Sequence, residues 1–157
     1  MIVLVTGGAG FIGCNFVRHS LAADPDLRLV NLDALTYAGH LASLRDVSES
    51  HGDRYRFVHA DIRDLEVVRR IFSEHDIDTV VHLAAESHVD RSIEGPSAFI
   101  QTNIIGTFTL LEAARQSWLS SPPPPPPSPR FLHVSTHEIY RPLGETGLFK
   151  EKKPYEP

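Results

Sequence analysis

The sequence predicts an α/β fold, a doubly wound parallel sheet with helices on both faces. The first observation is that five short apolar runs, rich in β-branched residues, alternate with segments of helical periodicity. The second is that a glycine-rich turn follows the first run and precedes an apolar-periodic segment. Helical crossovers between such strands give the succession βαβαβαβαβ and the sheet order 3-2-1-4-5. We therefore expect a crevice at the carboxyl ends of strands 1 and 4.

The strands are expected at residues 1–6, 27–33, 55–60, 79–85 and 131–135. A first helix is expected at 11–23, and a weaker helical pattern runs from Leu41 to Val47. Asp64 is expected to cap the next helix, and Pro96 to open a long helix ending near Trp118. Segment 120–129 contains six consecutive prolines and is expected as an extended surface loop, with 139–157 as an irregular tail. The whole chain, 1–157, is expected to form one domain.

The turn after the first strand carries the pattern Gly8-x-Gly10-x-x-Gly13. Glycines permit a tight turn, a close approach of the backbone to a pyrophosphate and close packing of helix on strand. Asp33 ends the second apolar run about 20 residues later, where its carboxylate would accept hydrogen bonds from ribose hydroxyls and repel a 2′-phosphate. These residues predict a Rossmann-type fold that binds NAD rather than NADP. The alternative is a structural turn with an unrelated acid.

Composition narrows the classes of function. The formal net charge of −5 gives no support to a nucleic-acid partner, and no apolar segment approaches the length of a membrane helix. The single cysteine, Cys14, cannot form an internal disulfide and is expected to pack in the core, which favours a cytoplasmic location. The nine histidines are scattered without metal-ligand spacing, so no metal site is expected.

Three segments are specific enough to indicate a family: Thr-Gly-Gly-Ala-Gly-Phe-Ile-Gly at 6–13, Leu-Asp-Ala-Leu-Thr-Tyr-Ala-Gly at 32–39 and Leu-Ala-Ala-Glu-Ser-His-Val-Asp-Arg-Ser at 83–92. The first marks the broad superfamily alone. Together they resemble the N-terminal half of the dTDP-glucose 4,6-dehydratases, which are extended short-chain dehydrogenases/reductases. The resemblance covers essentially all 157 residues. Two alternatives stay open: a sister nucleotide-sugar epimerase, and a non-catalytic NAD-binding module that recruits partners through its proline run.

The resemblance implies a lyase that converts dTDP-glucose to dTDP-4-keto-6-deoxyglucose, with bound NAD taking up and returning a hydride. Ser87 and Thr136 would contact the sugar nucleotide, and a homodimer is a further expectation. A binding role is also expected for His88, Asp90 and Arg91, which follow the fourth strand. The residues implied at the cofactor are Gly7, Gly10, Phe11, Ile12, Gly13, Asp33, Ala34, Leu35, Thr36, Asp61, Ile62, Leu83, Ala84, Ala85, Ser87 and Thr102.

The sequence departs from the family's pattern after the fifth strand. The implied catalytic residues are Thr136, His137 and Glu138, but similar enzymes have Asp, the acid for the leaving 6-hydroxyl, where this chain has His137. An imidazolium can also donate a proton, with different size and geometry. The sequence ends at Pro157, before the family's Tyr-x-x-x-Lys pair, and neither Tyr140 nor Tyr155 has a lysine at that spacing. We therefore expect this chain alone to bind NAD and to have little or no turnover.

Overall fold

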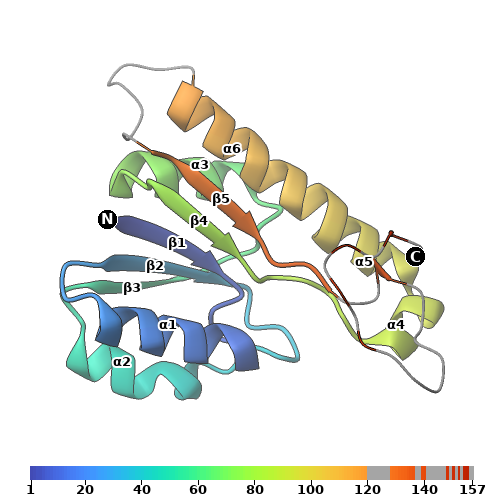
Figure 1. The fold of residues 1–157 in the computed structure, drawn as a ribbon, viewed down its shortest axis with the longest axis horizontal. Helices are drawn as coiled ribbons and strands as arrows, with labels where there is room; N and C mark the ends of the chain where they lie inside the picture. The colour runs from blue at the N-terminus through green and yellow to red at the C-terminus, as the bar shows by residue number, and fades with distance from the viewer. Residues whose placement is uncertain are drawn as a thin grey trace.

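A computed structural model describes residues 1–119, 128–136, 139–140, 148, 150, 152 and 154–155. One sheet contains five parallel strands, whose arrows point the same way in Figure 1. Their order, β3-β2-β1-β4-β5, confirms the predicted topology. The strands are β1 (Ile2–Thr6), β2 (Arg28–Asp33), β3 (Tyr55–His59), β4 (Thr79–His82) and β5 (Arg130–His133).

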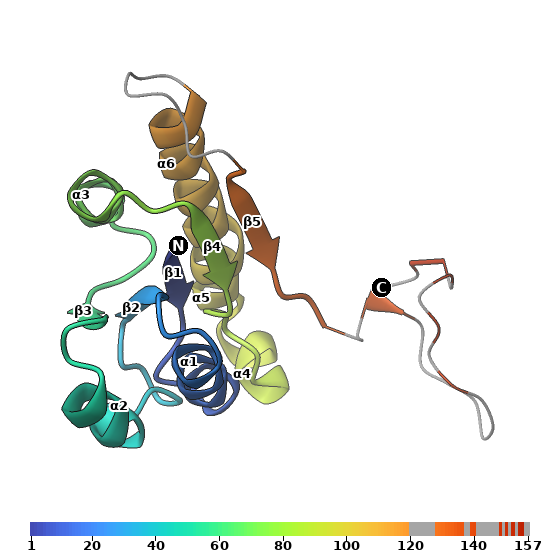
Figure 2. The same cartoon turned by 60° about the vertical axis from the view of Figure 1, so that its left-hand side comes forward.

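Helices cover both faces of the sheet. The helical elements are α1 (Phe11–Ala23), η1 (Leu41–Leu44), α2 (Arg45–Ser50), α3 (Leu65–His75), α4 (Val89–Glu94), α5 (Pro96–Phe99), η2 (Ile100–Gly106) and α6 (Thr107–Leu119). Figure 2 shows α1 and α2 on one side of the strands and α3 and α6 on the other. The predicted cap of α3 is present, since the Asp64 side chain accepts a hydrogen bond from the Val67 backbone N–H.

Successive residues of β1 point into two separate cores. Val3 and Val5 lie in the same buried cluster as Val17 of α1. Leu4 packs on the other face, in the cluster that contains Leu110 of α6. Both faces of the central strand are therefore buried, which explains why its sequence is continuously apolar rather than alternating.

Two strands end two or more residues earlier than the sequence predicts. β4 ends at His82 rather than at residue 85, because its neighbour β1 ends at Thr6 and Gly7 turns the chain away with φ +72°. β5 ends at His133 rather than at residue 135, in register with the shortened β4. The long helix expected from Pro96 to near Trp118 is confirmed as the unbroken succession of α5, η2 and α6, with π-helical turns in η2 that the sequence does not reveal. The short helix α4 was not predicted, because its sequence shows no apolar periodicity.

The predicted proline loop and irregular tail fall mostly on residues 120–127 and 141–157, which lie largely outside the described residues. Within the described part of the chain, no helix combines the length and apolar character that crossing a bilayer requires.

Candidate functional site

A groove of about 730 Å³ runs across the carboxyl ends of the strands, where the topology predicts a ligand site. It is lined by the glycine turn, the segments that follow β2, β3 and β4, the η2 helix and residues 133–136 after β5. A second hollow, of about 780 Å³, follows the edge strand β3 and the amino ends of β1 and β2. Because that hollow lies away from the strand ends and the glycine turn, we assign the candidate site to the groove.

The groove brings together nearly all the residues that the resemblance implies. The implied cofactor residues all line it except Leu35, and Thr136 lines it as well. Thr102, which lies outside the strand ends, reaches the groove from η2. His137 and Glu138 lie outside the described residues.

The glycine turn shows why its glycines are required. Gly7 has a φ of +72°, a conformation that side chains disfavour, and a Cβ there would lie 2.6 Å from the Ala84 backbone nitrogen. A Cβ on Gly13 would lie 2.2 Å from the Gly7 carbonyl oxygen. Gly10 differs: its φ of −76° suits any residue, and the nearest atom to its Cβ would be 3.4 Å away. The packing of the described residues therefore does not require glycine at position 10.

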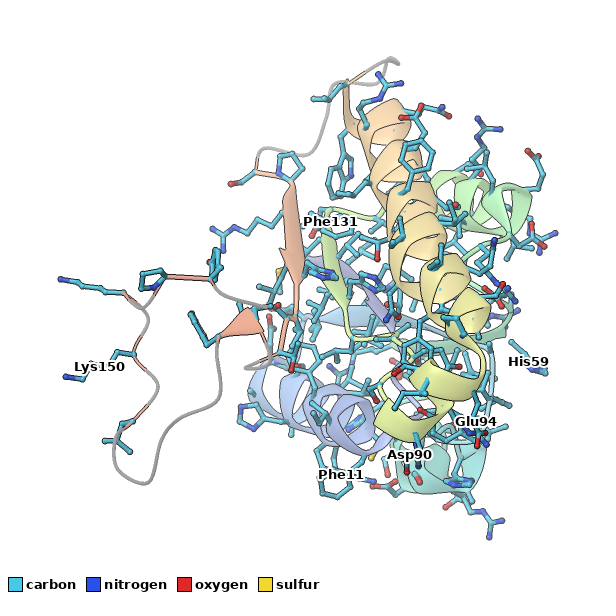
Figure 3. The ribbon with its side chains drawn as sticks, turned by 90° about the vertical axis from the view of Figure 1, so that its right-hand side faces the viewer. Phe11, His59, Asp90, Glu94, Phe131 and Lys150 are labelled. Carbon is cyan, nitrogen blue, oxygen red and sulfur yellow. The ribbon has the colours of Figure 1, made fainter. Side chains whose placement is uncertain are left out.

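The space beside Gly10 fits a phosphate group. Gly10 is the N-cap of α1 and has no side chain to occupy the free N–H groups of the first helical turn. Phe11 and Ile12, the first residues of the helix, are 86% and 66% exposed at the groove, and Figure 3 shows Phe11 extending outward from α1. A dinucleotide pyrophosphate matches this combination of an open backbone, the N–H groups of a first helical turn and the positive end of a helix dipole.

Asp33 forms the floor of the adjacent part of the groove. Its carboxylate accepts one hydrogen bond from the Ala9 N–H and another from the Leu35 N–H, each at 2.8 Å. The Leu35 bond holds that residue in a left-handed conformation, φ +50°, and turns its side chain into the core beside the groove. Each carboxylate oxygen keeps a lone pair that a ribose hydroxyl can use.

Across the groove, the segment after β4 is held by Asn103 of η2. The Asn103 amide accepts a hydrogen bond from the Glu86 N–H at 2.8 Å and donates one to the Glu86 carbonyl at 2.9 Å. The π-helical geometry of η2 places this side chain at the groove. Such π-helical turns are frequent at functional sites because they displace one side chain from the regular helix pattern.

Behind this segment, the buried side chain of His82 contacts two hydroxyl groups. Its Nδ1 lies 2.7 Å from the Thr6 Oγ1, and its Nε2 lies 2.9 Å from the Thr107 Oγ1. The His133 ring lies 5.0 Å away, centroid to centroid. Burial, together with repulsion from His133, lowers the pKa of His82 to about 4, so this imidazole is neutral at pH 7.

Next to residues that line the groove, a contact between Tyr37 and Arg91 links the loop after β2 to α4. Tyr37 lies in the loop after β2, and the Arg91 guanidinium of α4 stacks over its ring at 4.3 Å. The His88 ring meets Tyr37 edge-on at 6.4 Å. The 88–91 segment, for which we expect a binding role, therefore contacts the loop after β2 but is not part of the groove lining.

Several groove residues have no counterpart in the sequence-based prediction. Asn103, Thr107 and Phe99 are examples, and helical periodicity gives no means of identifying them. His82 carries a detectable signal, because it is a titratable residue within the apolar run of a central parallel strand. Among the described residues, no group of three or more His, Cys, Asp or Glu side chains is arranged to hold a metal ion.

The sheet order, the glycine turn and the groove define an α/β protein with a Rossmann-type fold. The chain belongs to the GDP-mannose 4,6 dehydratase family, whose family model matches residues 4–157. A dTDP-glucose 4,6-dehydratase of Xanthomonas campestris pv. campestris (strain B100) is 56% identical over 154 residues. That alignment covers 98% of this chain and 43% of the relative, so the chain spans less than half of the curated protein it matches.

Solved structures agree. DesIV, a dTDP-glucose 4,6-dehydratase from Streptomyces venezuelae with NAD and TYD bound, matches with a TM-score of 0.84 and 46% identity, over 100% of this chain and 46% of that chain. A UDP-glucose 4-epimerase of Thermus thermophilus in complex with NAD matches with a TM-score of 0.79 and 33% identity, over 100% of this chain and 45% of that one. These relatives confirm the resemblance to the dehydratases, to which the identity is higher than to the epimerase.

Proposed function

We propose that this chain is the NAD-binding region of a sugar-nucleotide 4,6-dehydratase whose substrate is dTDP-glucose. One observation carries the proposal: Gly10 has no side chain although neither its backbone nor its packing demands glycine, and it lines a groove beside a helix N-terminus. The names of the relatives, and the NAD held by DesIV, support the same function.

The residues have distinct proposed roles. Gly10, Phe11 and Ile12 would hold the pyrophosphate, and Asp33 with its following turn would hold the adenosine ribose. Asp61 and Ile62 would flank the adenine, and the segment 83–87 would line the nicotinamide side with Thr102. When bound, NAD would accept a hydride from the sugar and return it later in the same turnover.

The substrate end of the groove is assigned to Ser87 and Thr136, which line it. We propose Thr136, His137 and Glu138 as catalytic residues, with the His137 imidazolium in place of the family's carboxylic acid and Glu138 as the base. A proton donor that is misplaced by an ångström can slow a reaction by about a hundredfold. We therefore expect slower turnover with His137 than with Asp at this position.

Isothermal titration calorimetry with NAD and NADP tests the cofactor assignment. We expect NAD to bind and NADP to bind at least about tenfold more weakly, because Asp33 repels a 2′-phosphate. The absence of heat with millimolar NAD and a folded sample would contradict the proposal. Competition between dTDP-glucose and UDP-glucose, measured in the presence of NAD, would separate the dehydratase from an epimerase.

Location and assembly remain part of the proposal. The free thiol of Cys14 is buried and the sequence has no second cysteine, which is consistent with a reducing cytoplasm. We also propose a homodimer, no membrane association and, given the net charge of −5, no nucleic-acid partner. Size-exclusion chromatography with light scattering would detect the dimer.

A further inference from the structure

Three side chains form a row across the carboxyl ends of the central strands. Thr6 of β1 pairs in register with His82 of β4, and His82 pairs in register with His133 of β5. The row lies on the face that packs against α6, because His82 contacts Thr107 there. Figure 3 shows Phe131, two residues earlier on β5, between that strand and α6. Of the row, Thr6 and His82 are almost fully buried, at 0% and 1% exposure.

The hydrogen bonds around His82 fix where its proton lies. The Thr107 hydroxyl donates to the Asn103 carbonyl at 2.7 Å, so its oxygen can only accept from His82. Nε2 therefore carries the proton and Nδ1 carries the lone pair. The Thr6 hydroxyl must then donate to Nδ1, which leaves its oxygen to accept the Ala84 N–H at 3.3 Å.

These bonds form a chain with a single direction, from the Ala84 N–H through Thr6, His82 and Thr107 to the Asn103 carbonyl. The Asn103 side chain closes the loop, since its amide holds both backbone groups of Glu86. The chain thus begins and ends on the segment 84–86, which lines the groove. If Nδ1 of His82 carried a proton, it would donate to the Thr6 hydroxyl instead of accepting from it, and the hydrogen bonds would no longer all run in one direction.

We propose that His82, as the neutral Nε2–H tautomer, is a positioning residue that holds segment 84–86 in the shape the dinucleotide requires. The inference rests on the proposed NAD-binding function and adds a residue that does not itself line the groove. If His82 had a purely structural role, disrupting its hydrogen bonds would lower the free energy of unfolding and leave the NAD affinity of the folded protein unchanged. A positioning residue also affects NAD affinity under conditions in which the variant is folded.

Thr6→Val and Thr6→Ser form the matched pair for the test, because Thr6 is buried outside the groove lining. Valine has nearly the shape of threonine without the hydroxyl, whereas serine keeps it. We expect Thr6→Val to weaken NAD binding about tenfold by calorimetry at about 15 °C, and Thr6→Ser to retain most of the affinity. Faster amide hydrogen exchange at Ala84 and Glu86 should accompany the loss in Thr6→Val.

Nitrogen-15 NMR of the histidine side chains in the unmodified chain gives an independent readout. A His82 signal pattern of the neutral Nε2–H tautomer at pH 7 is expected, and an Nδ1–H or doubly protonated ring would overturn the inference. Equal NAD affinities in the unmodified chain and a folded Thr6→Val would also overturn it. If Thr6→Val does not fold, the tautomer of His82 in the unmodified chain tests the inference. If the unmodified chain binds no NAD, the proposed function fails, while tautomer and exchange still test the positioning network.

Discussion

The two walls of the groove are built differently. The wall formed by β1, α1 and the turn after β2 contains the glycine turn and Asp33, and its strands are buried on both faces. The opposite wall, formed by the segment after β4 and by β5, depends on η2 and α6 for its hydrogen bonds. On β5, Leu132 is 54% exposed. Both walls depend on hydrogen bonds between separated segments, 24 residues apart for Ala9 and Asp33 and 17 residues apart for Glu86 and Asn103. The difference is that the first wall carries a recognisable sequence motif, whereas the second is held by polar side chains of helices that no motif marks.

Gly13→Ala should produce the largest effect and act on the first wall. The added Cβ would lie 2.2 Å from the Gly7 carbonyl oxygen and 2.6 Å from the Gly8 Cα. Both are backbone atoms, which cannot move aside without distorting the turn. We expect the free energy of unfolding to fall by about 3 kcal/mol, measured by urea denaturation.

Gly10→Ala is the matched control, since in the part of the chain that the structure describes no atom would lie closer than 3.4 Å to its Cβ. Its free energy of unfolding should change by less than about 0.5 kcal/mol, while its NAD affinity falls at least about tenfold. Equal stability losses in the two variants would remove the distinction between the packed glycine and the groove glycine.

Acid should weaken the second wall through His82. Its pKa is about 4 in the folded chain and near the ordinary 6.5 in the unfolded chain, so unfolding takes up a proton between these values. The free energy of unfolding should therefore fall as pH drops from about 6.5 to about 4, by about 3 kcal/mol in total from this residue, and then level off. Urea denaturation at several pH values, compared with a His82→Gln variant, isolates the contribution. Parallel pH profiles for both proteins would contradict it.

Asp33→Asn also tests the first wall and should destabilise it less than Gly13→Ala. An amide can accept one of the two backbone N–H groups but turns its own NH₂ towards the other, so one hydrogen bond is lost. We expect a destabilisation of about 2 kcal/mol and a smaller preference for NAD over NADP. Asp46→Asn, which removes an exposed ion pair with Arg18, is the control and should change neither quantity noticeably. An unchanged cofactor preference in Asp33→Asn would remove Asp33 from the specificity argument.

Arg91→Ala should have the smallest effect, because it removes the exposed contact with Tyr37 that links α4 to the loop after β2. The expected loss of stability is about 0.5 kcal/mol by thermal or urea denaturation, with Arg91→Lys retaining part of it. A loss several times larger would show that these two segments are coupled more strongly than one stacked guanidinium allows.

The sequence predicted the parts of the molecule that a motif or the alternation of strands and helices encodes. The strand order follows from the alternation of strands and helices, and the glycine turn with Asp33 follows from spacing alone. The end of β4 was misplaced because it depends on where β1 stops, which is a property of the neighbouring strand. Asn103 and Thr107 could not be identified because their importance arises from contacts with β4 and the segment after it.

The open space beside Gly10 has a consequence for how this chain can diverge. A copy of the chain that no longer served a ligand could acquire a side chain at position 10 and still fold, because no atom of the described residues would lie closer than 3.4 Å to the added Cβ. Position 13 has no such freedom, since any larger residue meets the backbone of the turn. In a related chain, a side chain at position 10 would therefore indicate loss of ligand binding, whereas a side chain at position 13 would indicate loss of the fold.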